Sequence, residues 1–176
     1  MSEDMLGYFK VYPDFPKKGI NFYDIQSVLE KPDIWRRVID SLTALVKESG
    51  AELVLGIESR GFITGVPVAD KLGLPFGMVR KPGKLPGAIL TQDYELEYGS
   101  DAVQIQKDLI TPGMKVAIVD DLLATGGTMK AAGDLVKAAG GNLVLGVCVI
   151  ELHELSGRDK LGFPFQGLVR APLDPF

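Results

Sequence analysis

The sequence has very little cysteine and no excess of positive charge. It contains one cysteine in 176 residues, and its 23 acidic residues outnumber its 19 basic residues, for a net charge of −4. One cysteine cannot form an internal disulfide bond, and Cys148 lies in an apolar run, so we expect a buried thiol. An acidic chain does not attract nucleic acid or an anionic membrane through its overall field, so neither is expected as a partner.

Long hydrophobic segments are also missing. The apolar runs are about as long as a strand and fall well short of the ~20 residues that a membrane span needs. The first ten residues include Glu3 and Asp4 and contain no apolar stretch of the kind found in a signal peptide. These absences predict a cytoplasmic protein.

What the sequence does contain is the composition of a globular domain, with 46% hydrophobic and 24% charged residues. Short, continuous apolar runs are typical of strands buried on both faces, and apolar spacings of three and four are typical of helices. The predicted strands cover 53–57, 75–79, 116–119 and 143–150, and the predicted helices cover 32–49, 62–72 and 128–139. This alternation predicts one α/β domain over residues 1–176, with a mainly parallel sheet flanked by helices.

Two stretches lie outside the alternation. Residues 1–31 are rich in aromatic residues, proline and glycine, and are interpreted as an appended hood, completed by part of the C-terminal region. Residues 83–106 carry glycines among charged residues. Long glycine-containing loops inside compact domains are usually functional or disordered, so this stretch is expected to be a flexible loop.

The chemistry is concentrated in residues 116–128. A buried apolar strand leads into Asp120 and Asp121, and a loop of small residues then leads into a helix. The loop residues are Ala124, Thr125, Gly126, Gly127 and Thr128. Open α/β sheets bind ligands outside the carboxyl ends of their strands, where backbone amides at a helix start can surround an oxyanion. The segment therefore predicts a phosphate site, although it has neither the lysine of a Walker loop nor a GxGxxG pattern.

The two carboxylates restrict the ligand further. Asp120 and Asp121 would repel a polyphosphate placed directly against them. They suit ribose hydroxyls, a Mg²⁺ ion or a positive charge that develops on a sugar carbon. A phosphate in the loop and a sugar over the acids together describe a phosphoribosyl group. The alternative is a plain strand-to-helix turn with an acidic cap.

This segment resembles the phosphoribosyl diphosphate (PRPP) signature of the type I phosphoribosyltransferase family. Further stretches resemble the adenine-specific members of that family, and they lie at 12–22, 56–62, 79–87, 96–99 and 105–108. The resemblance implies a reaction of purine salvage in which adenine and PRPP give AMP and diphosphate. It also implies the type I fold with a hood and a flexible catalytic loop, a Mg²⁺ cofactor and a cytoplasmic homodimer.

By the same resemblance, several residues bind the phosphates. A cis peptide bond is expected between Glu58 and Ser59. The residues implied to contact PRPP or AMP are the loop residues above with Ser59, Arg60, Arg80, Lys84 and Tyr98. Whether Lys81 also binds the phosphates stays open. For the cluster of Arg80, Lys81 and Lys84, the alternative is a basic face exposed to solvent. Mg²⁺ would be held mainly by PRPP, with Asp120 as the nearest candidate carboxylate.

The remaining implied roles concern adenine and catalysis. Adenine would be bound by Asn21, Phe22, Tyr23 and Leu152, with Phe22 stacking on the purine. Glu97 would act as general acid or base on the purine, while Asp120 and Asp121 support the ribose. Phe22 could equally be a core residue, and Glu97 an exposed loop residue. Animal members of the family carry an arginine where this chain has Tyr23. His153 matches no catalytic position of the family and is interpreted as a surface residue.

Two other functions are compatible with these residues. One is an enzyme of the same fold that acts on xanthine, hypoxanthine or guanine. The other is a regulator that senses PRPP without turnover. The regulator is disfavoured because residues for the leaving group and the closing loop are both present, and no basic segment for nucleic acid is visible.

Overall fold

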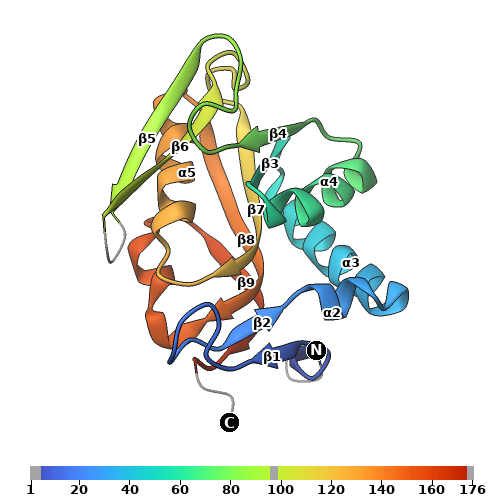
Figure 1. The fold of residues 1–176 in the computed structure, drawn as a ribbon. Coiled ribbons are helices and arrows are strands. Elements are labelled where there is room, and N and C mark those ends of the chain that lie inside the picture. Colours follow the sequence, from blue (N-terminus) through green and yellow to red (C-terminus); the bar gives the residue numbers. More distant parts are fainter. Residues whose placement is uncertain (1–4, 96–98, 174–176) are drawn as a thin grey trace.

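The structure, a computed structural model that describes residues 5–95 and 99–173, is built around one central sheet (Figure 1). The strands are β1 (Lys10–Tyr12), β2 (Phe22–Asp24), β3 (Leu53–Ile57), β4 (Phe76–Val79), β5 (Ile89–Glu95), β6 (Ser100–Gln106), β7 (Lys115–Leu123), β8 (Asn142–Leu152) and β9 (Phe165–Ala171). The helices are α2 (Gln26–Leu29), α3 (Pro32–Ser49), α4 (Arg60–Leu72) and α5 (Gly127–Ala138), with 3-10 helices η1 (His153–Leu155) and η2 (Gly157–Lys160).

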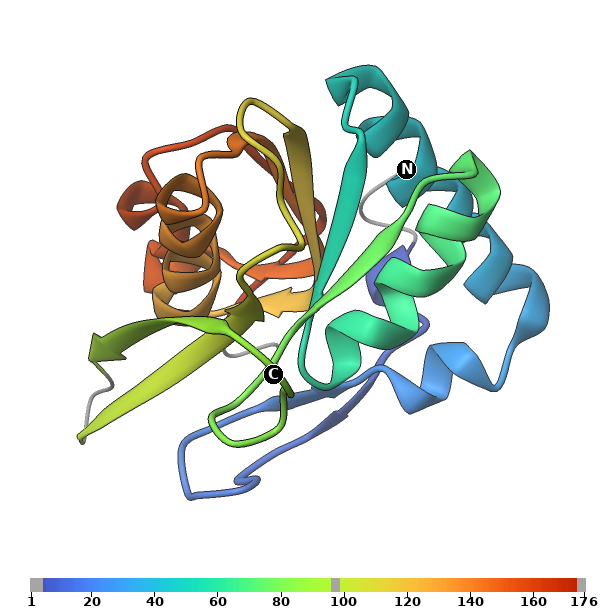
Figure 2. The ribbon, with the colours of Figure 1, turned by 90° about the horizontal axis from the view of Figure 1, so that it is seen from above.

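The central sheet is parallel and covered on both faces. Its five strands have the order β4-β3-β7-β8-β9, and every neighbouring pair is parallel. Helices α3 and α4 lie on one face and α5 on the other, as the view from above shows (Figure 2). Along β7, Ala117 and Val119 join the core on the α3 and α4 side, while Val116 and Ile118 join the core on the α5 side. Burial of both faces explains the continuous apolar runs, and the α/β prediction is confirmed.

The helix ends follow local sequence signals. Pro32 occupies the first turn of α3, where its missing amide costs no hydrogen bond. Gly50 and Gly73 end α3 and α4 in the left-handed conformation, at φ of 68° and 63°, which glycine adopts at little cost. Both helices end where the sequence predicts, at residues 49 and 72.

Two features of the sheet differ from the prediction. β7 does not end at Val119 but continues to Leu123, because Leu122 and Leu123 still pair with β8. The acidic pair therefore lies on the strand itself. β9 was not predicted, since it is an edge strand whose burial is interrupted and which contains Gly167, so it lacks a continuous apolar run.

The stretches outside the alternation form two small sheets. β1 and β2 pair antiparallel near the N-terminus, and β5 and β6 form an antiparallel hairpin that packs against α5. The predicted loop 83–106 therefore contains regular strands, and its flexibility stays a prediction. Cys148 is buried, as expected. Among the described residues, no helix combines the length and apolar character that crossing a membrane requires.

Candidate active site

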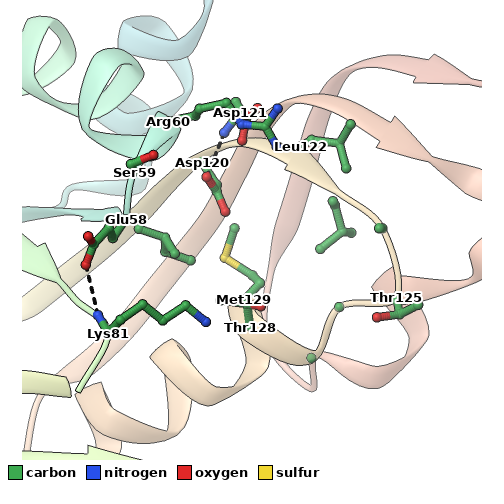
Figure 3. Close-up of a pocket in the computed structure, with 15 residues that line it drawn as sticks. Glu58, Ser59, Arg60, Lys81, Asp120, Asp121, Leu122, Thr125, Thr128 and Met129 are labelled. Atoms are coloured by element: carbon green, nitrogen blue, oxygen red, sulfur yellow. Dashed lines mark hydrogen bonds and ion pairs between the residues drawn. The ribbon is translucent and has the colours of Figure 1, made fainter. Parts of the chain in front are cut away.

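A cavity of about 230 Å³ opens at the carboxyl ends of β3 and β7. It is lined by residues 57–60, by Lys81 and by the continuous stretch 120–129 (Figure 3). Parallel sheets place their ligands at this edge, and the cavity joins two of the sequence-predicted groups. These groups are the acidic pair with its loop and the turn at Ser59.

The loop after β7, residues 124–128, is called the phosphate loop below. Gly126 precedes α5 with φ of 83° and makes no side-chain cap hydrogen bond. The first amides of a helix have no partner within the helix, so those at the start of α5 can donate to an anion, aided by the helix dipole. The Thr125 and Thr128 side chains line the same cavity (Figure 3).

A second helix begins at the same cavity. Ser59 precedes α4, also without a side-chain cap hydrogen bond, and the peptide bond between Glu58 and Ser59 is cis, as the resemblance implies. Gly61 lets α4 approach β7 closely, because a Cβ there would lie 2.9 Å from Asp120 Oδ1. Two helix N-termini thus add positive potential to one cavity.

The two carboxylates of the acidic pair have different surroundings. Asp121 is buried, and its Oδ2 lies 2.9 Å from Nε of Arg60. Asp120 is half-buried and accepts the Asp121 amide at 2.9 Å. Burial raises the pKa of Asp120 well above its usual range, and the charge of Asp121 raises it further, against the opposing effect of Arg60. A positive charge arriving in the cavity would therefore favour the ionised form of Asp120.

Residues 80–84, called the basic segment below, are organised around Glu58. Lys84 Nζ donates to Glu58 at 2.6 Å, the Lys81 amide at 2.9 Å and Arg80 Nε at 3.3 Å. Burial alone would raise the pKa of Glu58, but these hydrogen bonds, with Lys84 foremost, lower it to about 2. Arg80 and Lys84 are therefore close to the cavity but paired with one of its lining residues.

Within the basic segment, Lys81 is the residue that lines the cavity itself. Its Nζ donates to the Tyr94 hydroxyl at 2.8 Å and contacts Asp101 Oδ2, and both partners are on the β5–β6 hairpin. Burial would lower the pKa of Lys81, but Asp101 and Tyr94 outweigh this effect and raise it. Lys81 thus links the hairpin to the cavity.

Three of the residues predicted to bind adenine, Asn21, Phe22 and Tyr23, lie on β2 or directly before it. The Arg60 guanidinium lies 5.4 Å from the centre of the Phe22 ring, so Arg60 joins this ring to Asp121. Tyr23 is buried and its hydroxyl donates to the Pro172 carbonyl at 2.6 Å. Asn21 donates to the Leu173 carbonyl at 3.0 Å. Tyr23 therefore joins β2 to the C-terminal segment.

The other predicted residues are placed as follows. Leu152 is buried at the end of β8. His153, interpreted as a surface residue, is half-buried and contacts the Ala171 carbonyl through Nδ1 at 2.9 Å. Glu97 and Tyr98 lie outside the described residues. Sequence reasoning missed the pairing role of Glu58, because its partners follow another strand and no local pattern connects them.

Comparisons with known proteins agree with this geometry. The family profile described as a phosphoribosyl transferase domain matches residues 25–161. The adenine phosphoribosyltransferase of Clostridium perfringens is 52% identical over 161 residues, which make up 91% of this chain and 94% of the relative.

Two crystal structures extend the similarity to the fold. The adenine phosphoribosyltransferase of Thermoanaerobacter pseudethanolicus matches with a TM-score of 0.93 at 43% identity, covering 96% of this chain and 99% of that chain. The Saccharomyces cerevisiae enzyme, in complex with an imino-altritol bisphosphate and adenine, matches with a TM-score of 0.90 at 40% identity, covering 94% and 97%. From the matched domain, the identity over most of its length and the shared fold, this chain belongs to the phosphoribosyltransferase family, among the adenine phosphoribosyltransferases.

Proposed function

We propose that this chain catalyses the reaction of adenine with PRPP to give AMP and diphosphate, a step of purine salvage. The observation that carries the proposal is that one cavity holds a half-buried carboxylate between the phosphate loop and the N-terminus of α4. One end of this cavity suits a 5′-phosphate and the other suits a diphosphate. The carboxylate between them suits the sugar carbon that changes partner.

The chemistry follows from these positions. The bond from adenine N9 to ribose C1′ forms while the bond from C1′ to the diphosphate oxygen breaks, and the N9 proton leaves. Positive charge develops on the ribose ring beside Asp120, whose ionised form would be stabilised by that charge. Negative charge develops on the diphosphate, which we place where Ser59 precedes α4 and Arg60 begins it, with Arg80 and Lys84 nearby.

Mg²⁺ is part of the proposal, as an ion that accompanies PRPP. Among the described residues, no three His, Cys, Asp or Glu side chains gather as a metal site. Mg²⁺ commonly keeps several waters and uses one or two carboxylates with substrate phosphates, so Asp120 at the cavity fits such an arrangement. The ion would offset charge on the leaving diphosphate.

The adenine side rests on fewer contacts. We place the purine against Phe22, whose ring already faces the Arg60 guanidinium, with Asn21, Tyr23 and Leu152 around it. Glu97 is proposed as the residue that accepts or donates the purine proton, and Tyr98 as a PRPP contact, on the resemblance alone. A backbone amide and carbonyl suffice to recognise N1 and the 6-amino group of adenine, whereas a 6-oxopurine needs a donor for O6.

Turnover with each purine tests the proposal. Purified protein with PRPP, Mg²⁺ and adenine should make AMP, and hypoxanthine, xanthine and guanine should react at least roughly a hundredfold less well. Comparable turnover of a 6-oxopurine would assign the other substrate class. Tight PRPP binding without turnover of any purine would instead favour the regulator.

The proposal also covers the organisation of the protein. Residues 1–31 with part of the C-terminal region are assigned to a hood, and residues 83–106 to a loop that closes over the substrates. Hydrogen bonds from Asn21 and Tyr23 to the C-terminal segment support the first assignment. A homodimer in the cytoplasm is proposed from the family resemblance, and sedimentation of the purified protein tests the dimer.

A further inference from the structure

The phosphate loop is in contact with a segment that the proposed reaction does not use. The segment, residues 156–160, lies between β8 and β9 and includes η2. A Cβ built on Gly157 would lie 2.9 Å from the Gly126 nitrogen and closer still to the Ala124 carbonyl oxygen. In the other direction, a Cβ on Gly126 would lie 2.5 Å from the Gly157 oxygen. The two backbones can approach this closely only because both residues are glycine.

Arg158 attaches this segment to the sheet. Its Nε and Nη2 donate to the two carboxylate oxygens of Glu151 at 2.9 and 2.5 Å, and Nη1 donates to the Phe165 carbonyl at 3.1 Å. Glu151 is buried at the end of β8. A guanidinium that binds a buried carboxylate with two parallel hydrogen bonds fixes direction as well as distance.

The position of Glu151 connects this attachment to the loop. In the sheet register, Glu151 on β8 pairs with Leu123 on β7, and Leu123 is the last residue before the phosphate loop. The loop therefore leaves the sheet beside the carboxylate that holds Arg158. Its middle then meets Gly157, the residue next to Arg158. Loop, segment and sheet form a closed set of contacts.

Such support matters because the N-cap of α5 is Gly126, which has no side chain to cap the helix, and glycines leave the backbone with more freedom than other residues. Amides bind an anion well only when they are already oriented toward it. We propose that Gly157 and Arg158 are positioning residues for the 5′-phosphate, Gly157 by direct backbone contact with the loop and Arg158 by holding Gly157 in place. This inference rests on the function proposed above.

A Gly157→Ala variant tests the backbone contact. The added methyl group has to displace the phosphate loop, because both obstructing atoms belong to the backbone. We expect the KM for PRPP to rise by roughly tenfold to a hundredfold, and calorimetric binding of ribose 5-phosphate to weaken equally. The KM for adenine should stay within about twofold, since the adenine side is built from other elements.

Ser156→Gly is the matched control. Ser156 is exposed, has φ of 50° and precedes Gly157, so glycine there alters the same segment without adding an atom toward the loop. Wild-type KM values are expected for this variant.

The Arg158 variants test the attachment. Arg158→Gln removes the charge and the fork, and should raise the KM for PRPP with little change in the KM for adenine. Arg158→Lys keeps the charge, and should recover part of the loss. If Gly157→Ala fails to fold, the two Arg158 variants decide whether the segment positions the phosphate loop.

The outcomes are distinct. An unchanged KM for PRPP in Gly157→Ala and Arg158→Gln would overturn the inference. Equal rises in the KM for PRPP and the KM for adenine, together with a lower melting temperature, would also overturn it, because a general structural role predicts that pattern. A wild-type protein that makes no AMP and binds no ribose 5-phosphate would instead overturn the proposed function, before any variant is compared.

Discussion

The phosphate loop and the basic segment are both candidate phosphate binders, yet they hold their binding groups in opposite conditions. The loop presents helix amides that no side chain caps. The basic segment presents cations that are already paired, Arg80 and Lys84 with Glu58 and Lys81 with Asp101. On the proposed function, the loop would be prepared before substrate arrives, whereas the segment would have to exchange a carboxylate for a phosphate.

This difference matches the two ends of the proposed substrate. The 5′-phosphate stays attached to the ribose throughout the reaction, so a fixed cradle of amides suits it. The diphosphate has to be bound, stabilised as it leaves and then released, so cations with an alternative partner suit it. A carboxylate that takes the cations back would lower the cost of product release. We expect substitutions in the loop to be more damaging than substitutions in the segment.

Replacing one glycine by alanine in each region gives the largest predicted difference in kcat/KM. Gly126 and Gly83 both have positive φ, 83° and 80°, where a side chain costs about 1–2 kcal/mol. A Cβ on Gly126 would also meet the Gly157 backbone, whereas a Cβ on Gly83 would meet nothing within 4 Å. Gly126→Ala should lower kcat/KM for PRPP by roughly a hundredfold or more, and Gly83→Ala by less than about tenfold.

Steady-state kinetics with PRPP varied at saturating adenine provides this measurement. Thermal unfolding of both variants is the control, since the shared backbone cost should appear in each. Equal kinetic losses at the two glycines would show that the loop is no more prearranged than the segment.

The acidic pair, on β7 just before the phosphate loop, gives the next predicted difference, this time in stability. Asp121→Asn removes the carboxylate of an ion pair with Arg60, whose side chain is 39% exposed, and should lower the free energy of unfolding by about 1 kcal/mol. Asp120→Asn should instead stabilise the free protein, because burial and Asp121 disfavour the ionised carboxylate at neutral pH. Both variants should lose more than about tenfold in kcat/KM.

Denaturant unfolding at pH 7 measures the stabilities. The sign for Asp120 follows from its raised pKa: its stabilising contribution is complete below the unfolded pKa and is lost as pH rises toward the folded pKa. The gain from Asp120→Asn should therefore vanish below about pH 4. A loss of stability at pH 7 would contradict the pKa assignment.

The sequence predicts the loop better than it predicts the segment, for a physical reason. Strand, carboxylates and glycines are contiguous in residues 116–128, so local patterns identify the phosphate loop. The partners of Arg60, Arg80 and Lys81 come from other elements and depend on how strands meet, which no local pattern records. β9 was missed for a related reason, because an edge strand with interrupted burial has a weak apolar pattern.

Acidification tests the pairing in the basic segment. The pKa of Glu58 is lowered from 4.5 to about 2, so its contribution is complete above about pH 4.5 and is lost as pH falls toward 2. Glu58→Gln should lower the free energy of unfolding by about 1 kcal/mol at pH 7, and the difference from wild type should disappear toward pH 2. Glu151 and Asp101, which also have lowered pKa values, titrate in both proteins and cancel in this difference. A difference that does not depend on pH would contradict the charge pairing.

The smallest predicted effect is at the hairpin, where Tyr94→Phe removes a single hydroxyl. That hydroxyl accepts from Lys81 at 2.8 Å and donates to Asp101 at 3.1 Å, while the ring lies so near the phosphate loop that a Cβ built on Gly127 would be 3.3 Å from it. Phenylalanine keeps the ring contact, so the loop should be undisturbed, and stability should fall by about 1 kcal/mol. Lys81 then has one hydrogen bond fewer to break when PRPP binds, so the KM for PRPP should fall slightly, by less than about threefold. Parallel kinetics and unfolding of the wild type and this variant measure both changes, and a rise in the KM for PRPP would mean that the hydroxyl positions Lys81 for the substrate and does not compete with it.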